Sequence, residues 1–353
     1  MDKTLCGISA LRLLRVPPQY LSVLPCLPDF DTPYGRQQLR DNYTASKIVG
    51  IPIHALEFGA HGINSTLVKP HVWTTSLPHR AIIDTPFDVS LTSPLFTALL
   101  LARHISTIHL AMLLYEFMGT FTVFSPSKDL DEAYARARRE LAIPRMQDWK
   151  RLVDTKGSAT NMWTRPPLFT SRDLELFLSE VAGQHGYKPL QSAAHLVTGS
   201  VASPFEARAS LLLTAPRATG GLGLTGMQND LKIELNDDAR KICGLRHVYA
   251  DLAWEKTSKH PFVVVECQGK AVHGSPIKGL TDDNRALALQ NMGIEVIRIT
   301  YEQIADERRF EIFGAYLAKK LGVQMRSPAP KTARATQELR EQLFCDWEQV
   351  GLI

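Results

Sequence analysis

The sequence contains few cysteines and no long hydrophobic run, and its charges nearly cancel. Its 353 residues include five cysteines, none of them in a C-x-x-C pair. This gives no sign of a disulfide framework or a zinc site and is typical of a reducing compartment. No stretch approaches the roughly 20 apolar residues that span a membrane, and the first 15 residues lack the apolar core of a signal peptide. We therefore expect a cytoplasmic protein with no membrane partner.

What is present is the composition of an ordinary globular protein. A hydrophobic fraction of 44% and a charged fraction of 22% argue against disorder. The net charge of +4 permits a nucleic-acid partner without requiring one. The length favours two or three domains. We expect an α+β regulatory or specificity region, a linker with helices, an α/β domain, and a linker with a C-terminal helix, at 1–154, 155–202, 203–324 and 325–353.

The N-terminal region divides into a first part of strands and a second part of helices. Residues 1–90 are rich in Pro, His and short apolar runs, which indicates strands and turns. Ser93, directly before a proline, caps a predicted helix, and Ser106 or Thr107 caps a second one that Gly119 ends. Two short helices in tandem form either a helix-turn-helix or a helical hairpin that covers a sheet.

Arginines cluster between Asp131 and Val153. The stretch is predicted to be helical and to break at Pro144. Its basic residues form either a solvated helix face or a face that contacts phosphates. The polar segment 155–167, which contains Gly and two prolines, marks a domain boundary.

Two predicted strands carry acidic residues in the C-terminal half. His247–Trp254 alternates, so its even-numbered residues share one face and Asp251 lies on the other. Phe262–Gln268 is apolar on both faces at its start, which is typical of a strand inside a sheet. The polar residues 255–260 between them close a hairpin.

The register of this hairpin brings acids together. If the turn is centred on the polar hexapeptide, Asp251 lies opposite Val264 and diagonal to Glu266, with Gln268 further along the same face. Carboxylates that converge inside a sheet are unfavourable unless something compensates their charge. Mg²⁺ (or Mn²⁺) is the expected cation, because Mg²⁺ prefers carboxylate and water oxygens.

A crossover follows the second strand. Thr281 caps a predicted helix that ends at Gly293, and Ile294–Thr300 forms the next strand. These elements form a β-α-β unit with a right-handed connection. A further amphipathic helix spans Tyr301–Leu321, and a last one spans Gln337–Val350. The predicted fold class is α/β, with an αβββαβ core and a mixed sheet.

A Ser-x-x-Glu sequence opens the helix that precedes these strands. Ser203 and Glu206 match a capping box, in which the glutamate reaches back to the Ser203 amide. Glu206 either serves the cap alone or also aims its carboxylate at the metal.

The ordered set of helix with Glu, strand with Asp, strand with Glu-x-Gln, crossover helix and final strand resembles the PD-(D/E)XK nuclease superfamily. Within it, the likeness is to very-short-patch-repair-like (Vsr-like) endonucleases. The resemblance covers about 120 residues and implies a restriction-endonuclease-like fold. The segments that carry it are 250–254 (ADLAW), 265–269 (VECQG) with His273, 282–285 (D-x-x-R), 289–293 (L-x-x-MG) and 296–300 (VIRIT).

The resemblance implies a magnesium-dependent endodeoxyribonuclease that hydrolyses phosphodiester bonds of DNA, a nuclease-like protein of phage defence. Asp251 and Glu266 would ligate the metal, with the Cys267 carbonyl as a further ligand. The metal would polarise the phosphodiester and lower the pKa of the attacking water. Glu206 matches the family's helix carboxylate.

Gln268 departs from the family, which usually has lysine at this position. Glutamine carries no charge to stabilise a transition state, although its amide can orient a water. Lys270 either supplies the missing charge or is an exposed loop lysine. His273 either contacts a phosphate or has no role, and Arg285 either contacts the DNA backbone or pairs with Asp282.

A short segment in the N-terminal half, 89–103, resembles abortive-infection antitoxin-like (AbiEi-like) regulators. Together with Gln268, it motivates the alternative of a catalytically inactive DNA-binding regulator that retains the nuclease fold. A metal-dependent hydrolase of another phosphodiester is the third interpretation.

Overall fold

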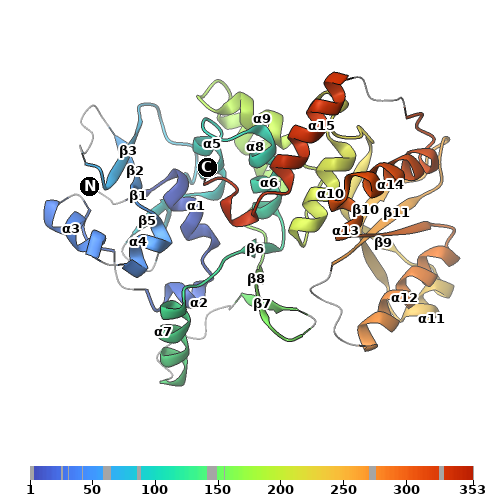
Figure 1. Ribbon diagram of the computed structural model, residues 1–353, viewed down its shortest axis with the longest axis horizontal. Helices are drawn as coiled ribbons and strands as arrows, with labels where there is room; N and C mark the ends of the chain where they lie inside the picture. The colour runs from blue at the N-terminus through green and yellow to red at the C-terminus, as the bar shows by residue number, and fades with distance from the viewer. Residues whose placement is uncertain are drawn as a thin grey trace.

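The computed structural model describes most of the chain. The described residues are 4–24, 27–30, 32–41, 43–58, 65–85, 89–140, 149–154, 156–269, 276–325 and 330–352, with side chains left out at 41, 43–45 and 276–282. They form a mixed α/β fold with three sheets (Figure 1). No helix among these residues is long and apolar enough to cross a membrane.

The first sheet lies in the N-terminal third and has the strand order β3-β2-β1-β5-β4. The described part of 1–90 contains the expected strands, and it also contains four short helices of at most nine residues that were not expected. In α1, Ala10 and Leu11 are fully buried, which shows that the Leu-rich piece packs as a helix. The elements are β1 (Thr4–Leu5), α1 (Gly7–Arg15), α2 (Pro18–Leu21), α3 (Pro33–Asp41), α4 (Tyr43–Val49), β2 (Ile53–Phe58), β3 (Val68–Trp73), β4 (Ile82–Asp84) and β5 (Ser90–Thr92).

Two helices form the centre of the molecule. Ser93 caps α5 (Pro94–Leu101), and Ser106 caps α6 (Thr107–Met118), as predicted. Nearly every residue of α6 is buried against other helices. These are α5, α9 (Tyr187–Ala194), α10 (Pro204–Thr214) and α15 (Pro330–Leu343). A helix enclosed in this way cannot enter a DNA groove, so the helix-turn-helix interpretation is wrong.

A three-stranded antiparallel sheet follows, in the order β6-β8-β7 (Phe121–Val123, Ala159–Thr164, Lys150–Val153). The arginine-rich helix α7 (Lys128–Arg139) ends well before the predicted Val153, and 155–167 contains strand β8 instead of a plain linker. Arg151 explains part of the difference, because its guanidinium lies 5.4 Å from the ring centre of the buried Trp163 on β8. Helix α8 (Ser171–Glu180) then leads to α9.

The third sheet is mixed and has the order β12-β11-β10-β9. Strands β9, β10 and β11 pair antiparallel, and β11 and β12 pair parallel. Helix α12 starts at Pro276, so Thr281 lies inside it and cannot be its cap. The elements are α10 (Pro204–Thr214), β9 (Met227–Glu234), α11 (Asp237–Cys243), β10 (His247–Trp254), β11 (Val263–Gln268), α12 (Pro276–Asn291), β12 (Glu295–Thr300), α13 (Tyr301–Ala305) and α14 (Glu307–Lys320).

Strand β10 changes sides in the middle of this sheet. Val248 and Ala250 pack in the cluster beneath α11 and α12, whereas Leu252 and Trp254 pack in the main core with α10 and α14 (Figure 1). The predicted single face for all even-numbered residues was therefore wrong. The switch occurs where Asp230 on β9 has a φ of +53°, a left-handed conformation that reverses the local pleat.

The C-terminal segment returns to the N-terminal half. Helix α15 covers Pro330–Leu343, seven residues before the predicted Gln337 start, and a 3-10 turn follows at Trp347–Gln349. The indole Nε1 of Trp347 donates to Glu116 Oε2 at 2.9 Å, and Arg15 Nη2 pairs with the same oxygen at 2.7 Å. One hydrophobic cluster extends from Cys6 to Val350, so both halves share a core.

Candidate functional site

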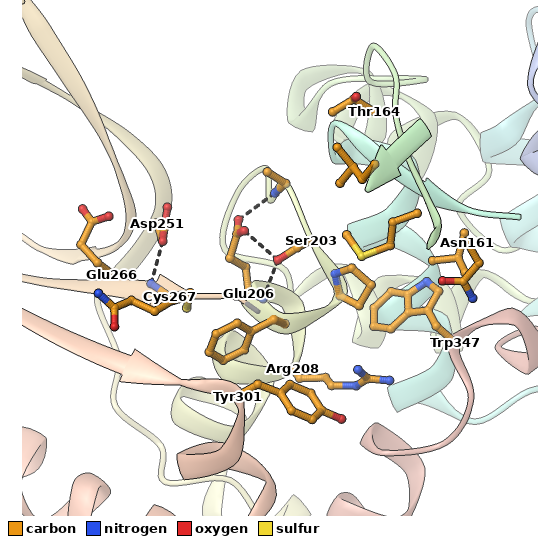
Figure 2. A pocket seen from close by; sticks show the side chains of 18 of the residues that line it. Asn161, Thr164, Ser203, Glu206, Arg208, Asp251, Glu266, Cys267, Tyr301 and Trp347 are labelled. Carbon is orange, nitrogen blue, oxygen red and sulfur yellow. Dashed lines mark hydrogen bonds between the residues drawn. The ribbon is translucent and has the colours of Figure 1, made fainter. Parts of the chain in front are cut away.

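The two acids predicted to meet do lie side by side. The paired register of β10 and β11 ends at Leu252 and Val265, so Asp251 and Glu266 are the next residues of the two strands. Figure 2 shows both carboxylates pointing the same way from neighbouring strands. The predicted register was wrong by two residues, because the turn is closed by Thr257 and His260, whose N–H···O distance is 3.0 Å. The observed register brings Asp251 and Glu266 nearer to each other along the two strands than the predicted diagonal arrangement did.

Two hydrogen bonds hold Asp251. The Cys267 amide donates to its Oδ2 at 2.7 Å, and the side chain of Asn229 donates to its carbonyl oxygen at 3.0 Å. The first bond links the carboxylate of β10 to the backbone of β11. The second fixes the backbone of Asp251 against β9.

Glu206 approaches the same place from the N-terminus of α10. Its Oε1 accepts from the Ser203 hydroxyl and its Oε2 from the Ala202 amide, both at 2.7 Å. The Ser203 hydroxyl in turn accepts from the Glu206 amide at 3.2 Å. The cap thus exists, although the glutamate reaches Ala202 instead of the predicted Ser203 amide. In Figure 2, Asp251 lies between Glu206 and Glu266.

The electrostatics of the three acids indicate that they are close neighbours. Burial and the charge of Asp251 raise the pKa of Glu206 to about 8. Burial also raises the pKa of the Cys267 thiol well above its usual value, with further contributions from Asp251, Glu206 and Glu266. The charge of each of the three carboxylates therefore reaches the Cys267 thiol.

A buried polar network joins the segments that carry Glu206 and Asp251. Asn229 Nδ2 donates to the Ser210 hydroxyl at 2.9 Å as well as to the Asp251 carbonyl, and Ser210 donates to the Glu206 carbonyl at 2.7 Å. Asn229 Oδ1 accepts from the Thr198 hydroxyl at 2.6 Å. Thr198 also lies 2.9 Å from the Tyr115 hydroxyl on α6, so the network extends into the molecular centre.

Arginines border the acids. Arg285 Nη2 lies 3.9 Å from Glu266 Oε2 and donates to the Tyr249 carbonyl at 2.9 Å. Its Nε is buried, with no hydrogen-bond partner among the described atoms. Arg298 pairs with Asp283 at 2.8 Å on the rim. The predicted pairing of Arg285 with Asp282 lies outside the described side chains.

Gln268 ends strand β11 two residues after Glu266 and is half-buried at the edge of the same site. The predicted contacts Lys270 and His273 lie outside the described residues.

These residues line one cavity of about 770 Å³. Glu206, Asp251, Glu266 and Gln268 lie on one side of it, together with Arg285 and Arg298. The opposite side is formed by β8 and the C-terminal segment, where Figure 2 labels Asn161, Thr164 and Trp347. The site is therefore a recess between two parts of the molecule.

Sequence reasoning missed several of these residues. Asn229 and Asp230 lie on β9, whose alternating sequence MQNDLKIE contains an unusual Asn-Asp pair that could have marked it. Asp230 lies between Asn229 and Leu231, which pair with Leu252 and Ala250 on either side of Asp251. The cavity wall from β8 and Trp347 carried no signal, because only tertiary packing brings it to the acids.

The donor set fits a hard cation better than a transition metal. Within the described residues, no three His, Cys, Asp or Glu side chains come together in a group that could hold a metal ion. Mg²⁺ does not need such a group, because it usually keeps several waters and takes one or two carboxylates. Asp251, Glu266 and the Cys267 carbonyl fit that pattern.

No family model matches the chain, and no curated protein or solved structure matches it either.

Proposed function

We propose that the protein is a metal-dependent nuclease that hydrolyses DNA phosphodiester bonds, on a restriction-endonuclease-like PD-(D/E)XK core of the Vsr-like type. The order α10, β9, β10, β11, α12, β12 supports this core. The observation that carries the proposal is that Asp251 and Glu266, which follow the last paired residues of two adjacent strands, line one cavity together with Glu206.

The roles follow from the positions of the residues. Asp251 and Glu266 would hold Mg²⁺ or Mn²⁺, with the Cys267 carbonyl as an additional ligand. The bound cation would polarise the phosphodiester and lower the pKa of the attacking water. The Cys267 amide keeps the Asp251 carboxylate in place. Glu206 lines the same cavity, where burial and the charge of Asp251 raise the pKa of its carboxyl group.

Gln268 and Arg285 would together replace the lysine that PD-(D/E)XK nucleases usually have at position 268. The carboxamide of Gln268 can orient the water, and Arg285, within 3.9 Å of Glu266, supplies positive charge next to the reacting phosphate.

Cleavage assays test the proposal. Purified protein should cut single-stranded circular DNA and nick supercoiled plasmid with Mg²⁺ or Mn²⁺ present, and EDTA should stop both reactions. Asp251→Asn and Glu266→Gln should lower the rate by at least about 100-fold. Asp238→Asn, which changes an exposed acid on α11 in the same way, is the control. Cleavage that survives in Asp251→Asn would overturn the proposal.

A DNA-binding regulator without catalysis is the second candidate. Gln268 favours this candidate, because PD-(D/E)XK nucleases usually have a charged lysine at this position and glutamine is neutral. Salt-dependent DNA binding with no divalent-dependent cleavage would support this candidate, and wild-type cleavage that Asp251→Asn abolishes would exclude it.

A further inference from the structure

The acids line a partly open cavity, and its size limits the part of a substrate that can enter it. Its volume of about 770 Å³ corresponds to a cube roughly 9 Å on a side. Pockets of about 300–1,000 Å³ hold one small organic molecule. A whole base-paired duplex must be wider than its own major groove of about 12 Å, so it is too large to enter. A single nucleotide does.

The side of the cavity next to the acids suits a phosphate. Arg285 and Arg298 border Glu266, and both are partly exposed. The carboxylates themselves repel a phosphate unless a cation lies between them. Phosphate binding at this side therefore requires a divalent cation.

The rest of the wall suits a nucleobase. Four aromatic side chains line it, and the Arg208 guanidinium lies 5.3–5.9 Å from three of their ring centres. Arg208 is held there by hydrogen bonds to the carbonyls of Leu343 and Cys345, at 2.6 and 3.0 Å. Phe205, Trp347 and Arg208 are themselves buried, so the half-buried rings of Tyr301 and Phe344 are the ones that a base can reach. Aromatic rings stack on bases of any sequence. The four aromatic residues are Phe205, Tyr301, Phe344 and Trp347.

Polar groups face this wall from β8. Asn161 and Thr164 line the cavity, and Asn161 is exposed. Figure 2 shows both across the cavity from Glu206. Asn161 donates one amide hydrogen to Glu348 Oε1 at 3.0 Å, so its second N–H and its oxygen can bond to the edge of an unpaired base. The Thr164 hydroxyl donates to the Lys150 carbonyl at 3.1 Å and can accept from the base. In a duplex that edge is already paired.

We infer that the site takes an unpaired nucleotide: the base enters the recess between α10, β8 and the C-terminal segment, and its phosphate reaches Asp251 and Glu266. The substrate class is a single-stranded nucleic acid, or a strand with a flipped or unpaired nucleotide. This inference rests on the proposed function, because the same acids would hold the cation that cleavage of the strand requires.

Equilibrium binding with Ca²⁺ in place of Mg²⁺ tests the inference without turnover. Fluorescence anisotropy compares a short labelled DNA oligonucleotide, its RNA counterpart, the blunt DNA duplex and a duplex with a central mismatch bubble. Wild-type protein should bind the single strands and the bubble roughly 10-fold or more tightly than the blunt duplex. Comparison of the DNA and RNA oligonucleotides then shows whether the site prefers deoxyribose or ribose.

Variants on β8 provide the structural control. Met162→Trp fills the cavity from a half-buried position and should abolish the preference for single strands. Ala159→Trp places the same side chain on an exposed part of the same strand, outside the cavity lining, and should leave the preference intact. Thermal unfolding of both variants checks that they fold. If Met162→Trp unfolds, Asn161→Trp at the exposed rim replaces it.

The outcomes separate this inference from the proposed function. Equal binding of duplex and single strand, or a preference unchanged in a folded cavity-filling variant, overturns the inference even if the protein cleaves DNA. Strong, cavity-dependent single-strand binding supports it even if no cleavage occurs with Mg²⁺, in which case only the proposed nuclease activity fails.

Discussion

The side-chain amide of Asn229 lies 3.0 Å from the backbone carbonyl of Asp251, and the same nitrogen donates to Ser210 at 2.9 Å. One buried side chain thus connects the strand that carries Asp251 to the helix that carries Glu206. Tyr115 reaches the network through Thr198. The positions of the acids therefore depend on residues that touch no substrate.

Asn229→Asp should reduce cleavage by roughly 10- to 100-fold, as expected for a residue that supports metal ligands. The change keeps the shape of the side chain but removes both donated hydrogen bonds. Cleavage rate and Mn²⁺ affinity are the measurements.

Thr97→Val is the control for Asn229→Asp, because it removes a buried hydroxyl bonded to Thr92, remote from the acids. A purely structural role would make both variants lose stability alike, with metal affinity unchanged in each. That result would contradict the positioning role of Asn229.

At position 230, a change to glycine should leave the stability of the fold nearly unchanged, and a change to valine should lower it. Its φ of +53° favours residues without a β-branch. Asp230→Val should cost about 1–3 kcal/mol of unfolding free energy in urea denaturation, whereas Asp230→Gly should be nearly neutral. Gln228→Val, on the same strand with an exposed side chain, should cost little. Equal costs for valine at both positions would show that the left-handed conformation is not required.

Glu116 should be among the most sensitive residues of the core. Burial opposes its ionisation, but the charge of Arg15 and hydrogen bonds from Arg15 and Thr122 outweigh it and hold the pKa of Glu116 below its usual value. Glu116→Gln leaves a buried guanidinium without its counter-charge and should cost about 3–5 kcal/mol, measured by urea unfolding.

The double variant Glu116→Gln with Arg15→Met removes both charges and should recover part of the stability lost in Glu116→Gln. Additive losses would show that the two residues act independently.

A histidine pair should make the fold acid-sensitive. His54 Nδ1 lies 2.9 Å from His71 Nε2, and burial lowers the pKa of each to about 4, with nearby positive charge adding to the effect. The unfolded chain binds protons more readily, so stability is complete above about pH 6.5 and is lost as the pH falls from there towards 4. The loss should reach roughly 1–3 kcal/mol at pH 5, measured by chemical unfolding.

His71→Gln should flatten this pH dependence, because it removes one titrating ring and its effect on the other. His79→Gln, at an exposed position, is the matched control and should change nothing. An unchanged slope in His71→Gln would rule out this pair as the source.

Local patterns predicted the elements of the acidic site better than its geometry. Alternation and capping located β10, β11, α10 and both central helices, because these signals depend only on neighbouring residues. The hairpin register was missed, since the hydrogen bond between Thr257 and His260 sets the turn and Pro261 has no amide to extend the ladder. The face switch was missed because its cause, Asp230, lies on a different strand. The cavity required residues from 161 and 347 to meet those at 251, which no local pattern encodes.

The bond between Trp347 and Glu116 also affects how the chain is made. A ribosome-bound chain that has not yet released residues near 347 holds Glu116 and Arg15 without their indole partner, and lacks one wall of the cavity. The acids of β10 and β11 are synthesised earlier but have no enclosed recess at that stage. Completion of the pocket therefore follows the synthesis of all its other lining residues and requires residues 343–350 to dock against α6.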